Sequence, residues 1–343
     1  MKKIAFLLLL TVSLLTQAQN SSKKVAVYPV GFYNLENLYH PENTDERRDV
    51  EFSPTGNKAW TMDKYNKKLA NMAYVIDRIA KNYGGLVALG VSEIGNRKVL
   101  EDLLDTGELK GKNYAIVHYD SPDRRGVDVG LLYNPNIFKV TSSYPYPYRL
   151  PSNPNFRTRD QLLVSGTLAG EPLHIIVNHW PSRYGGGRSS ELREQAAALS
   201  KHITDSIRAA DPKAKVIIMG DLNDDPSDKS LKDVLQAKRK EKDTKENELF
   251  NTMWPLYDKG IGSLAYQGKW NLFDQIIISG NMLGKDRSTL KFWKAEIFNE
   301  DFLTEKEGRY KGYPMRTFRG NTFINGYSDH FPTLIYLVKE VTN

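Results

Sequence analysis

The sequence predicts an α/β protein in which mixed β-sheets form a sandwich. Apolar runs of about five to eight residues, which are typical of buried strands, alternate along the chain with a few amphipathic helices. Two of these runs, 161–168 and 173–177, are separated only by the turn residues 169–172. Because so short a turn joins antiparallel neighbours, a purely parallel sheet is disfavoured. No linker, repeat or low-complexity tract divides the chain, so we expect a single domain over residues 24–341.

The first half of the chain begins with an apolar run, 25–32, that we expect to be the first strand. Segment 63–81 is expected to be a helix, because Tyr65, Leu69, Met72 and Ile76 recur at helical spacing. Further elements are expected in the order strand 86–91, helix 97–104, and strands 114–119 and 127–133 around the charged loop 121–126.

The second half continues with the strand pair already described. A long helix is expected over 189–209, followed by strands at 215–219, 273–279 and 333–338. The mixed-charge run 238–246 is expected to be a solvated loop or helix end.

The first residues are typical of an export signal. Lys2 and Lys3 precede the apolar run 4–15, and Thr16-Gln17-Ala18 supplies small residues at a cleavage site. We therefore expect residues 1–18 to be a signal peptide and the mature chain to be secreted or periplasmic, without stable membrane association. The chain contains no Cys, so disulfides, thiolate metal sites and Cys nucleophiles are excluded.

The charge balance gives a modest indication of the partner. The formal net charge is +7, of which the two lysines of the signal contribute two. A mildly basic domain suits a polyanionic substrate such as DNA or RNA. We expect the chain to act as a monomer.

Polar residues that are capable of chemistry stand at the ends of the expected strands. Those at carboxyl ends are Asn34, Glu36, Glu93, His179, Asp221 and Asn223; those at or just before amino ends are Asp274, Asp329 and His330. If the strands at 273–279 and 333–338 run opposite to the others, all of these residues reach the same edge of the sandwich. The sequence therefore predicts one site.

The residue types fit phosphate-ester hydrolysis. Glu36 and Glu93, with Asn34 beside them, offer the oxygen ligands that Mg²⁺ prefers. Asp221 is suited to activate water and Asn223 to hold a phosphate oxygen, while His179 and His330 are suited to donate hydrogen bonds or protons. Asp274 is suited to orient one imidazole.

Seven ordered segments carry a family resemblance. They are Phe32-Tyr33-Asn34-Leu35-Glu36-Asn37, Val91-Ser92-Glu93-Ile94, Arg125-Gly126-Val127-Asp128-Val129-Gly130-Leu131-Leu132-Tyr133, Asn178-His179-Trp180-Pro181-Ser182-Arg183, Gly220-Asp221-Leu222-Asn223-Asp224, Asp274-Gln275-Ile276 and Ser328-Asp329-His330. The set resembles the endonuclease/exonuclease/phosphatase superfamily with its DNase-I-like fold, and its secreted bacterial nuclease-like branch. The resemblance implies a four-layer α/β/β/α sandwich of two mixed β-sheets and dependence on Mg²⁺ or Mn²⁺.

The resemblance also implies a role for each residue. Asn34, Glu36, Glu93 and Asp329 look like the metal-side residues, and His179 like the acid or phosphate-stabilising histidine. Asp221 and Asn223 look like the water-activating and phosphate-orienting pair, and Asp274 like the partner of His330. Two departures leave the substrate subclass open: Glu36 stands where some branches have Asp, and the Asn178-His179-Trp180 segment differs from branches with Tyr or Asn.

The substrate-binding residues are less constrained by the sequence. We expect Arg125, Asn178, Ser182 and Arg183 to contact substrate. The glycine loop 185–187 is suited to bind phosphate but equally to be a mobile surface loop. Aromatic and basic candidates remain open between binding and structural roles; they are Trp180, Tyr266, Trp270, Arg159, Arg316 and Arg319.

Three functions are compatible with these observations. The first is an exported metal-dependent endonuclease-like phosphodiesterase acting on DNA or RNA. The second is a phosphatase or phosphodiesterase, sphingomyelinase-like, acting on lipid or inositol phosphates, although no amphipathic membrane helix is evident. The third, a catalytically silent binding protein, would predict lost ligands, yet every expected position carries a competent residue.

Overall fold

The computed structural model describes residues 24–42 and 50–341. The expected signal peptide, residues 1–18, lies outside the described residues and stays a prediction. Within the described part of the chain, no helix is both long enough and apolar enough to span a membrane.

Two large mixed sheets form the centre of the described structure. The first has the strand order β14 (Lys291–Ile297), β17 (Thr333–Glu340), β1 (Val25–Leu38), β2 (Ala88–Ile94), β4 (Asp128–Tyr133) and β3 (Ala115–His118). The second has the order β5 (Phe138–Tyr146), β6 (Gln161–Leu168), β7 (Glu171–His179), β8 (Lys215–Asp221), β13 (Asp274–Ser279), β10 (Leu249–Asn251) and β9 (Ala237–Lys238). Each sheet combines parallel and antiparallel pairs, so the prediction of mixed sheets is confirmed.

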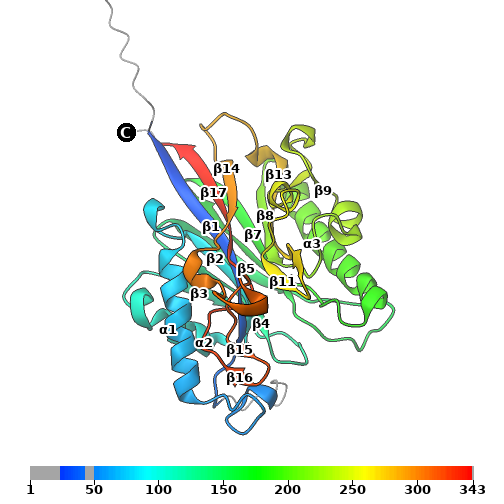
Figure 1. The fold of residues 1–343 in the computed structure, drawn as a ribbon. Coiled ribbons are helices and arrows are strands. Elements are labelled where there is room, and N and C mark those ends of the chain that lie inside the picture. Colours follow the sequence, from blue (N-terminus) through cyan, green and yellow to red (C-terminus); the bar gives the residue numbers. More distant parts are fainter. Residues whose placement is uncertain (1–23, 43–49, 342–343) are drawn as a thin grey trace, which may run out of the picture.

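Helices cover the outer faces of the two sheets. Figure 1 shows α1 (Met62–Arg78) and α2 (Arg97–Leu104) on one side and α3 (Ser190–Ala210) on the other, with the sheets between them. A fourth short helix is α4 (Trp254–Tyr257). The arrangement is the four-layer α/β/β/α sandwich that the family resemblance implied.

Two short hairpins project near one end of the sandwich. They are β11 (Leu264–Tyr266) with β12 (Lys269–Asn271), and β15 (Phe318–Arg319) with β16 (Thr322–Phe323). Both lie away from the marked C-terminus, toward the end at which β1 finishes (Figure 1).

The core lies between the sheets and requires close approach of their backbones. Gly90 on β2 faces Met219 on β8, and a Cβ at Gly90 would lie 2.6 Å from the Met219 sulfur and 3.2 Å from a methyl carbon of Val177. Such a contact is closer than packed atoms allow, so Gly90 permits the two sheets to meet. A second buried cluster, which includes Ile176, Ile218 and Ala197, packs α3 against the outer face of the second sheet.

Candidate active site

The strand directions bring the predicted residues to one edge of the sandwich. β1 runs parallel to β2, and β7 runs parallel to β8. β13 runs antiparallel to β8, and β17 runs antiparallel to β1. The strands expected at 273–279 and 333–338 therefore run opposite to the others, as the prediction of a single site required. In the second sheet His179 and Asp274 are both register partners of Asp221, so these three residues form a row across neighbouring strands.

Close packing of two strands explains why the first residue of the Gly-Asp-Leu-Asn segment is a glycine. A Cβ at Gly220 would lie 2.2 Å from the carbonyl oxygen of Asn178 on the parallel neighbour β7. Any larger residue would push β8 away from β7. Gly220 thus allows Asp221 to sit in register with His179.

Shifts in strand register determine the direction in which several side chains of the site point. The β1–β2 pairing shifts register between Asn34 and Leu38, and the β2–β4 pairing shifts between Ser92 and Ile94. The residues at these bulges have left-handed backbone conformations, with φ of 49° at Glu36, 54° at Asn37 and 58° at Glu93. Such conformations cost on the order of 1–3 kcal/mol each and persist where the surroundings impose them. Bulges of this kind redirect side chains, here toward the site.

Asp221 is the buried carboxylate at the centre of the row. Its Oδ2 accepts a hydrogen bond from Asn34 Nδ2 at 3.1 Å, and its Oδ1 accepts one from the backbone N–H of Asn223 at 3.1 Å. Burial raises the pKa of Asp221 to about 7, and the carboxylates of Asp274 and Glu93 add to this effect, whereas His330 opposes it. Asp221 is therefore poised to exchange a proton near neutral pH.

Asp274 and His330 form a buried pair next to Asp221. Asp274 Oδ2 lies 2.6 Å from His330 Nδ1 and also accepts a hydrogen bond from Ser263 Oγ at 2.5 Å. Burial alone would lower the pKa of His330, but Asp274 and Asp221 outweigh it, so that pKa lies well above its ordinary value. The second imidazole nitrogen, Nε2, lies 3.9 Å from Asp221 Oδ2 and 4.0 Å from Asp329 Oδ1. His330 thus presents a protonated Nε2 to the centre of the site.

His179 has the opposite electrostatic setting. Its Nε2 lies 3.6 Å from Asp221 Oδ2 and 3.9 Å from Glu93 Oε1. Burial lowers the pKa of His179 well below its ordinary value, and the guanidinium groups of Arg159 and Arg125 lower it further. One site therefore holds a neutral and a charged imidazole, a separation that assigns them different roles.

The other residues that the sequence analysis expects on the metal side lie beside this group. Glu93 Oε2 accepts the backbone N–H of Asn37 at 3.0 Å, which leaves Oε1 facing His179 and Arg125. Asp329 pairs with Arg316 at 2.7 Å, and although burial opposes this, His330, Arg316 and Lys68 lower the pKa of Asp329. Carboxylate and amide oxygens of this kind are hard ligands that suit Mg²⁺ or Mn²⁺. A divalent cation would also relieve the crowding of negative charge that raises the pKa of Asp221.

Glu36 has more partners than the sequence suggested. Its Oε2 accepts the backbone N–H of Thr317 at 2.7 Å and lies 3.6 Å from Lys68 Nζ, while its Oε1 lies 3.3 Å from Arg316 Nε. Both oxygens are thus engaged by protein cations or N–H groups. Its role as a metal-side residue stays a prediction, and Glu93 has the freer carboxylate oxygen.

Lys68 is a further residue of the site that was not predicted, and Arg316, an open basic candidate in the sequence, also lies there. The Lys68 side chain is fully buried, and its Nζ donates to Thr317 Oγ1 at 2.6 Å and to the carbonyl of Tyr327. Lys68 stands on the apolar face of α1 between Tyr65 and Met72, where a Lys violates the helical pattern. That violation was the signal that could have revealed it. Arg316 joins Glu36 to Asp329 and so links β1 to the start of β17.

The structure corrects one of the predicted substrate-binding residues and gives protein partners to a second. Asn178 is fully buried, donates to the carbonyls of Ile176 and Met219, and accepts from Trp180 Nε1, so it cannot contact substrate. Arg183 donates to the Asn223 carbonyl at 2.9 Å and is paired with Asp225 and Asp228. Arg183 therefore holds the loop that carries Asn223; its side chain is 36% exposed, and its contact with substrate stays a prediction.

Arg125 and Ser182 stay candidates for substrate contact. Arg125 donates to Asn37 Oδ1 and lies 3.8 Å from Glu93 Oε1, at the rim of the site. Ser182 is exposed, and its carbonyl accepts from Arg193. Of the open aromatic and basic residues, Trp180 and Arg159 are buried and structural.

Asn223 is held through its backbone N–H, which donates to Asp221, and through its side-chain amide. It has a left-handed backbone conformation, with φ of 51°, and its Nδ2 donates to the Trp180 carbonyl at 2.9 Å. The second amide hydrogen of Nδ2 is left for a ligand oxygen.

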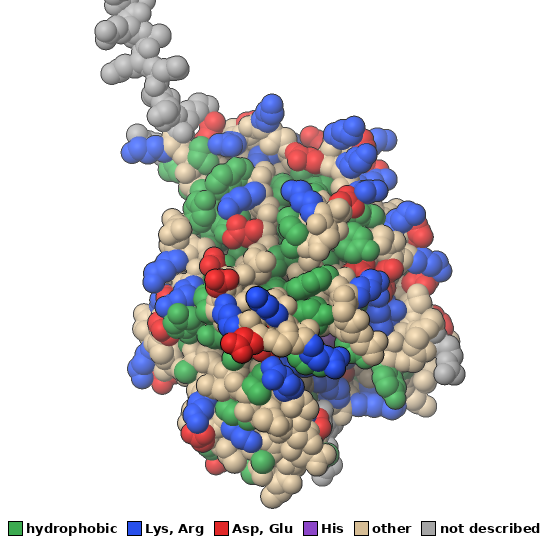
Figure 2. Space-filling view, in the orientation of Figure 1, with side chains coloured by type: hydrophobic (Ala, Val, Ile, Leu, Met, Phe, Trp, Pro, Cys, Tyr) green, Lys and Arg blue, Asp and Glu red, His purple; other side chains and the backbone are tan. Residues whose placement is uncertain are grey.

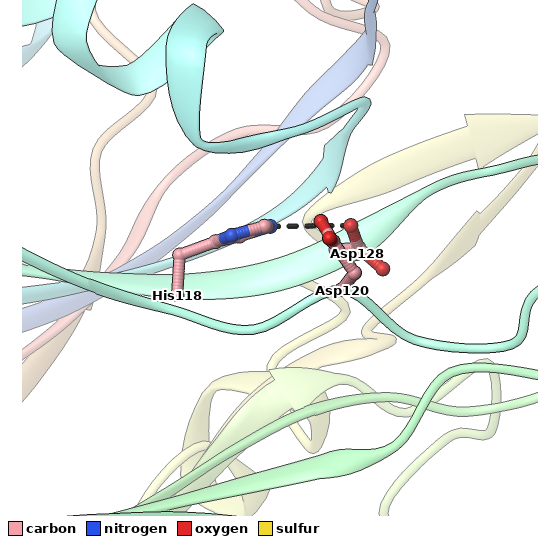
Figure 3. Close-up of side chains that lie close together, drawn as sticks. All are labelled: His118, Asp120 and Asp128. Atoms are coloured by element: carbon pink, nitrogen blue, oxygen red, sulfur yellow. Dashed lines mark hydrogen bonds and ion pairs between the residues drawn. The ribbon is translucent and has the colours of Figure 1, made fainter. Parts of the chain in front are cut away.

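A second group of titratable residues lies apart from this site. Figure 3 shows His118, Asp120 and Asp128 drawn close together, with His118 Nε2 lying 3.1 Å from Asp128 Oδ2. Asp128 Oδ1 also accepts hydrogen bonds from the backbone N–H and the hydroxyl of Ser121. The Asp128 carboxylate therefore has protein partners that explain its burial.

The electrostatics of Asp221 predict the pH dependence of turnover. If Asp221 accepts a proton in the reaction, its ionised form is required, and this form is lost as the pH falls through its pKa of about 7. A bound divalent cation lowers this pKa. We therefore expect kcat/KM to rise with pH and to level off, with a midpoint at or below pH 7. A kcat/KM profile measured from pH 5 to pH 9 checks this, and a rate that falls as pH rises from 5 to 7 would contradict it.

Comparison with known proteins gives a consistent result. Residues 29–339 match the family described as the Endonuclease/Exonuclease/phosphatase family. An endonuclease/exonuclease/phosphatase family protein from Bacteroides thetaiotaomicron is similar in structure, with 15% identity, a TM-score of 0.55, and coverage of 93% of this chain and 98% of that one. No match is found among the curated proteins.

Two further solved structures are similar to the chain. One is the mannosyl-6-phosphatase of Bacteroides thetaiotaomicron, with 14% identity, a TM-score of 0.55, and coverage of 90% of this chain and 99% of that one. The other is D. rerio TDP2 complexed with single strand DNA product, with 14% identity, a TM-score of 0.53, and coverage of 91% and 98%. At these identities the likeness establishes the fold.

Proposed function

We propose that this chain, which belongs to the endonuclease/exonuclease/phosphatase family, is a divalent-metal-dependent phosphodiesterase that cleaves nucleic acids. Membership of the family makes it a phosphodiesterase or phosphatase of that superfamily. The observation that carries the proposal is the row formed by His179, Asp221 and Asp274, with His330 bonded to Asp274. This row supplies a base, a protonated imidazole and a neutral imidazole within one buried edge.

Two pockets support a diester rather than a monoester as substrate. A pocket of about 350 Å³ is lined by residues that include Lys58 and Arg125, and a second of about 470 Å³ includes Arg309 and Asp329. Both pockets share Arg316 and Gly320. A phosphodiester carries a substituent on each side of its phosphorus, so two basic pockets that adjoin the site fit its two arms. D. rerio TDP2, which has the same fold, has been crystallised with a single strand DNA product.

The proposed reaction assigns one task to each side chain. Asp221, held by Asn34, takes a proton from a water molecule whose oxygen forms the new bond to phosphorus. Asn223 donates its remaining amide hydrogen to a phosphoryl oxygen. The bond from phosphorus to the leaving oxygen breaks, and a protonated imidazole, His330 in this arrangement, gives that oxygen a proton. Asp274 keeps the His330 ring oriented through Nδ1.

A metal ion has a defined place in this proposal. Glu93 and Asp329, with Asn34 and Glu36 nearby, would hold Mg²⁺ or Mn²⁺. The bound ion would neutralise negative charge that develops on the phosphoryl oxygens. The neutral His179, which faces both Glu93 and Asp221, would donate or accept a hydrogen bond at a phosphoryl oxygen.

Export and domain organisation are part of the proposal. The leader-like residues 1–18 would be removed, and the single domain 24–341 would act as a monomer in the periplasm or outside the cell. The mildly basic chain would attract nucleic acid there, because nucleic acid is a polyanion.

A substrate panel tests the proposed function. The purified chain is incubated with Mg²⁺ and, in parallel, with single-stranded DNA, supercoiled plasmid, RNA, sphingomyelin, an inositol polyphosphate and mannose 6-phosphate. We expect the wild-type protein to cleave at least one of the nucleic acids, and the Asp221→Asn protein to cleave none. Release of phosphate or phosphocholine while all nucleic acids stay intact would instead establish the phosphatase or lipid phosphodiesterase function.

A further inference from the structure

A pocket next to the active site has a composition suited to one nucleotide. It has a volume of about 470 Å³ and lies between the β11–β12 hairpin and the loop 304–314. Its lining includes Tyr266, Tyr310, Tyr313, Arg309, Arg316 and Arg319, and we call it the Tyr266 pocket. Asp329 also borders it, so the pocket opens directly onto the site.

One wall of the Tyr266 pocket is built on the catalytic pair. Trp270 of β12 stacks on Phe331, with ring centroids 6.1 Å apart and an interplanar angle of 18°. The backbone N–H of Phe331 donates to the Ser263 carbonyl at 2.7 Å, and Ser263 Oγ donates to Asp274. Because Phe331 directly follows His330, the hairpin is fixed relative to the Asp274–His330 pair.

The opposite wall is held by its own backbone hydrogen bonds. The N–H of Glu305 donates to the Tyr313 carbonyl, and the N–H of Gly312 donates to the Glu305 carbonyl, both at 2.8 Å. Tyr313 contacts Trp270 edge to face, with centroids 5.6 Å apart. The pocket is therefore preformed, which lowers the entropic cost of binding.

Tyr266 contributes an exposed aromatic ring to the lining of the pocket. Tyr266 stands at the tip of the hairpin with 66% of its surface exposed, just before a two-residue turn in which Gln267 and Gly268 have φ of 48° and 84°. Among the described residues no aromatic or cationic side chain covers the Tyr266 ring, and a tyrosine ring exposed in this way is available to stack on a ligand.

The positive charge in the pocket is only partly neutralised. Arg319 donates to Glu305 at 2.7 Å, and Arg316 pairs with Asp329. Arg309 lies over the Tyr310 ring, 4.9 Å from its centroid, and forms no ion pair with any residue that the structure describes. Its guanidinium is thus available for an anion such as a phosphate. Figure 2 shows Lys and Arg side chains spread over this face of the molecule, with Asp and Glu side chains among them.

We propose that the Tyr266 pocket is a subsite for one unpaired nucleotide adjoining the scissile phosphate, with its base stacked on tyrosine and its own phosphate paired with Arg309. A base within a duplex is stacked on both faces and paired at its edge, so it cannot enter such a pocket without being extruded. The enzyme therefore favours single-stranded nucleic acid or unpaired ends. The cleavage reaction at this subsite rests on the proposed function, whereas nucleotide binding by the pocket does not.

Equilibrium binding tests the subsite without turnover. Fluorescence anisotropy in EDTA compares a labelled single-stranded oligonucleotide, a blunt duplex of the same sequence and an abasic single strand of the same length. We expect the single strand to bind at least about tenfold tighter than either competitor. Tyr266→Ala should weaken single-strand binding roughly 5- to 150-fold, as loss of one base stack does, and Tyr266→Phe should keep the affinity because the ring remains.

Arg309→Gln tests the phosphate contact separately. We expect it to weaken binding and to reduce the slope of log K against log salt by about 0.7, the value for one phosphate contact on a single strand. Tyr144→Ala on the edge strand β5 and Arg239→Gln, which pairs with Asp258, are matched controls that should leave binding unchanged.

The outcomes separate this inference from the proposed function. Selective single-strand binding that Tyr266→Ala weakens supports the subsite even if no phosphodiester is cleaved. Equal affinity for single strand, abasic strand and duplex, or full affinity in Tyr266→Ala with its fold intact by circular dichroism, overturns it even if nucleic acids are cleaved. Displacement of the oligonucleotide by mannose 6-phosphate but not by a nucleotide also overturns it.

Discussion

Replacing Asp221 by Asn is expected to lower kcat by about 10²- to 10⁴-fold while the fold is preserved. The amide is nearly isosteric with the carboxylate and keeps an oxygen for the Asn223 N–H, but it cannot take a proton from water. Because Asp221 acts on the water and not on the substrate, KM should change much less than kcat. Steady-state kinetics on the substrate identified by the panel measure both parameters.

The control for this variant is Asp211→Asn, which makes the same chemical change at the exposed end of α3. It should retain full activity. Circular dichroism of both variants should match the wild type. Wild-type turnover by a folded Asp221→Asn protein would remove Asp221 from the reaction.

Removing divalent cations is expected to abolish turnover, and Mg²⁺ or Mn²⁺ should restore it. The carboxylates of Glu93, Asp329, Asp221 and Asp274 lie in one small region, and the cation provides the positive charge that the phosphoryl group requires. Binding should also raise the thermal midpoint of unfolding, by an amount equivalent to about 2.7 kcal/mol at a metal concentration of 100 Kd. Activity assays in EDTA and thermal scans with added Mg²⁺ measure the two effects.

Glu93→Gln provides the matched variant for the metal experiment. It keeps the size of the side chain but weakens a hard-cation ligand, so the thermal shift with Mg²⁺ should shrink or disappear. Glu108→Gln, on a solvated segment away from the site, should keep the shift. Full activity of the wild type in chelator would contradict the metal-dependent account.

Much of the site could be predicted because its polar residues lie at the ends of strands. Strand ends are visible as the limits of apolar runs, and α2 was expected over the same residues, 97–104, that it occupies. Asp221, Asp274 and His330 followed from this placement once two strands were reversed. The register between neighbouring strands then places His179 and Asp274 opposite Asp221.

Other features could not be predicted because their causes are tertiary. β5 and β14 are edge strands whose polar, charged and proline residues do not form an apolar run, so no strand was expected there. The bulges at Glu36 and Glu93 depend on pairing between strands, which a single sequence does not specify. The ion pairs that join Arg183 to the acidic loop 224–228 are likewise tertiary contacts that the sequence does not reveal.

The most direct test is cleavage of a labelled single-stranded oligonucleotide, assayed side by side with wild-type protein in Mg²⁺, wild-type protein in EDTA, and Asp221→Asn in Mg²⁺. We predict defined cleavage products in the first reaction and intact oligonucleotide in the other two. Equal cleavage in all three reactions, or none with wild-type protein in Mg²⁺, would contradict the assignment of this sheet edge as a metal-dependent nuclease site.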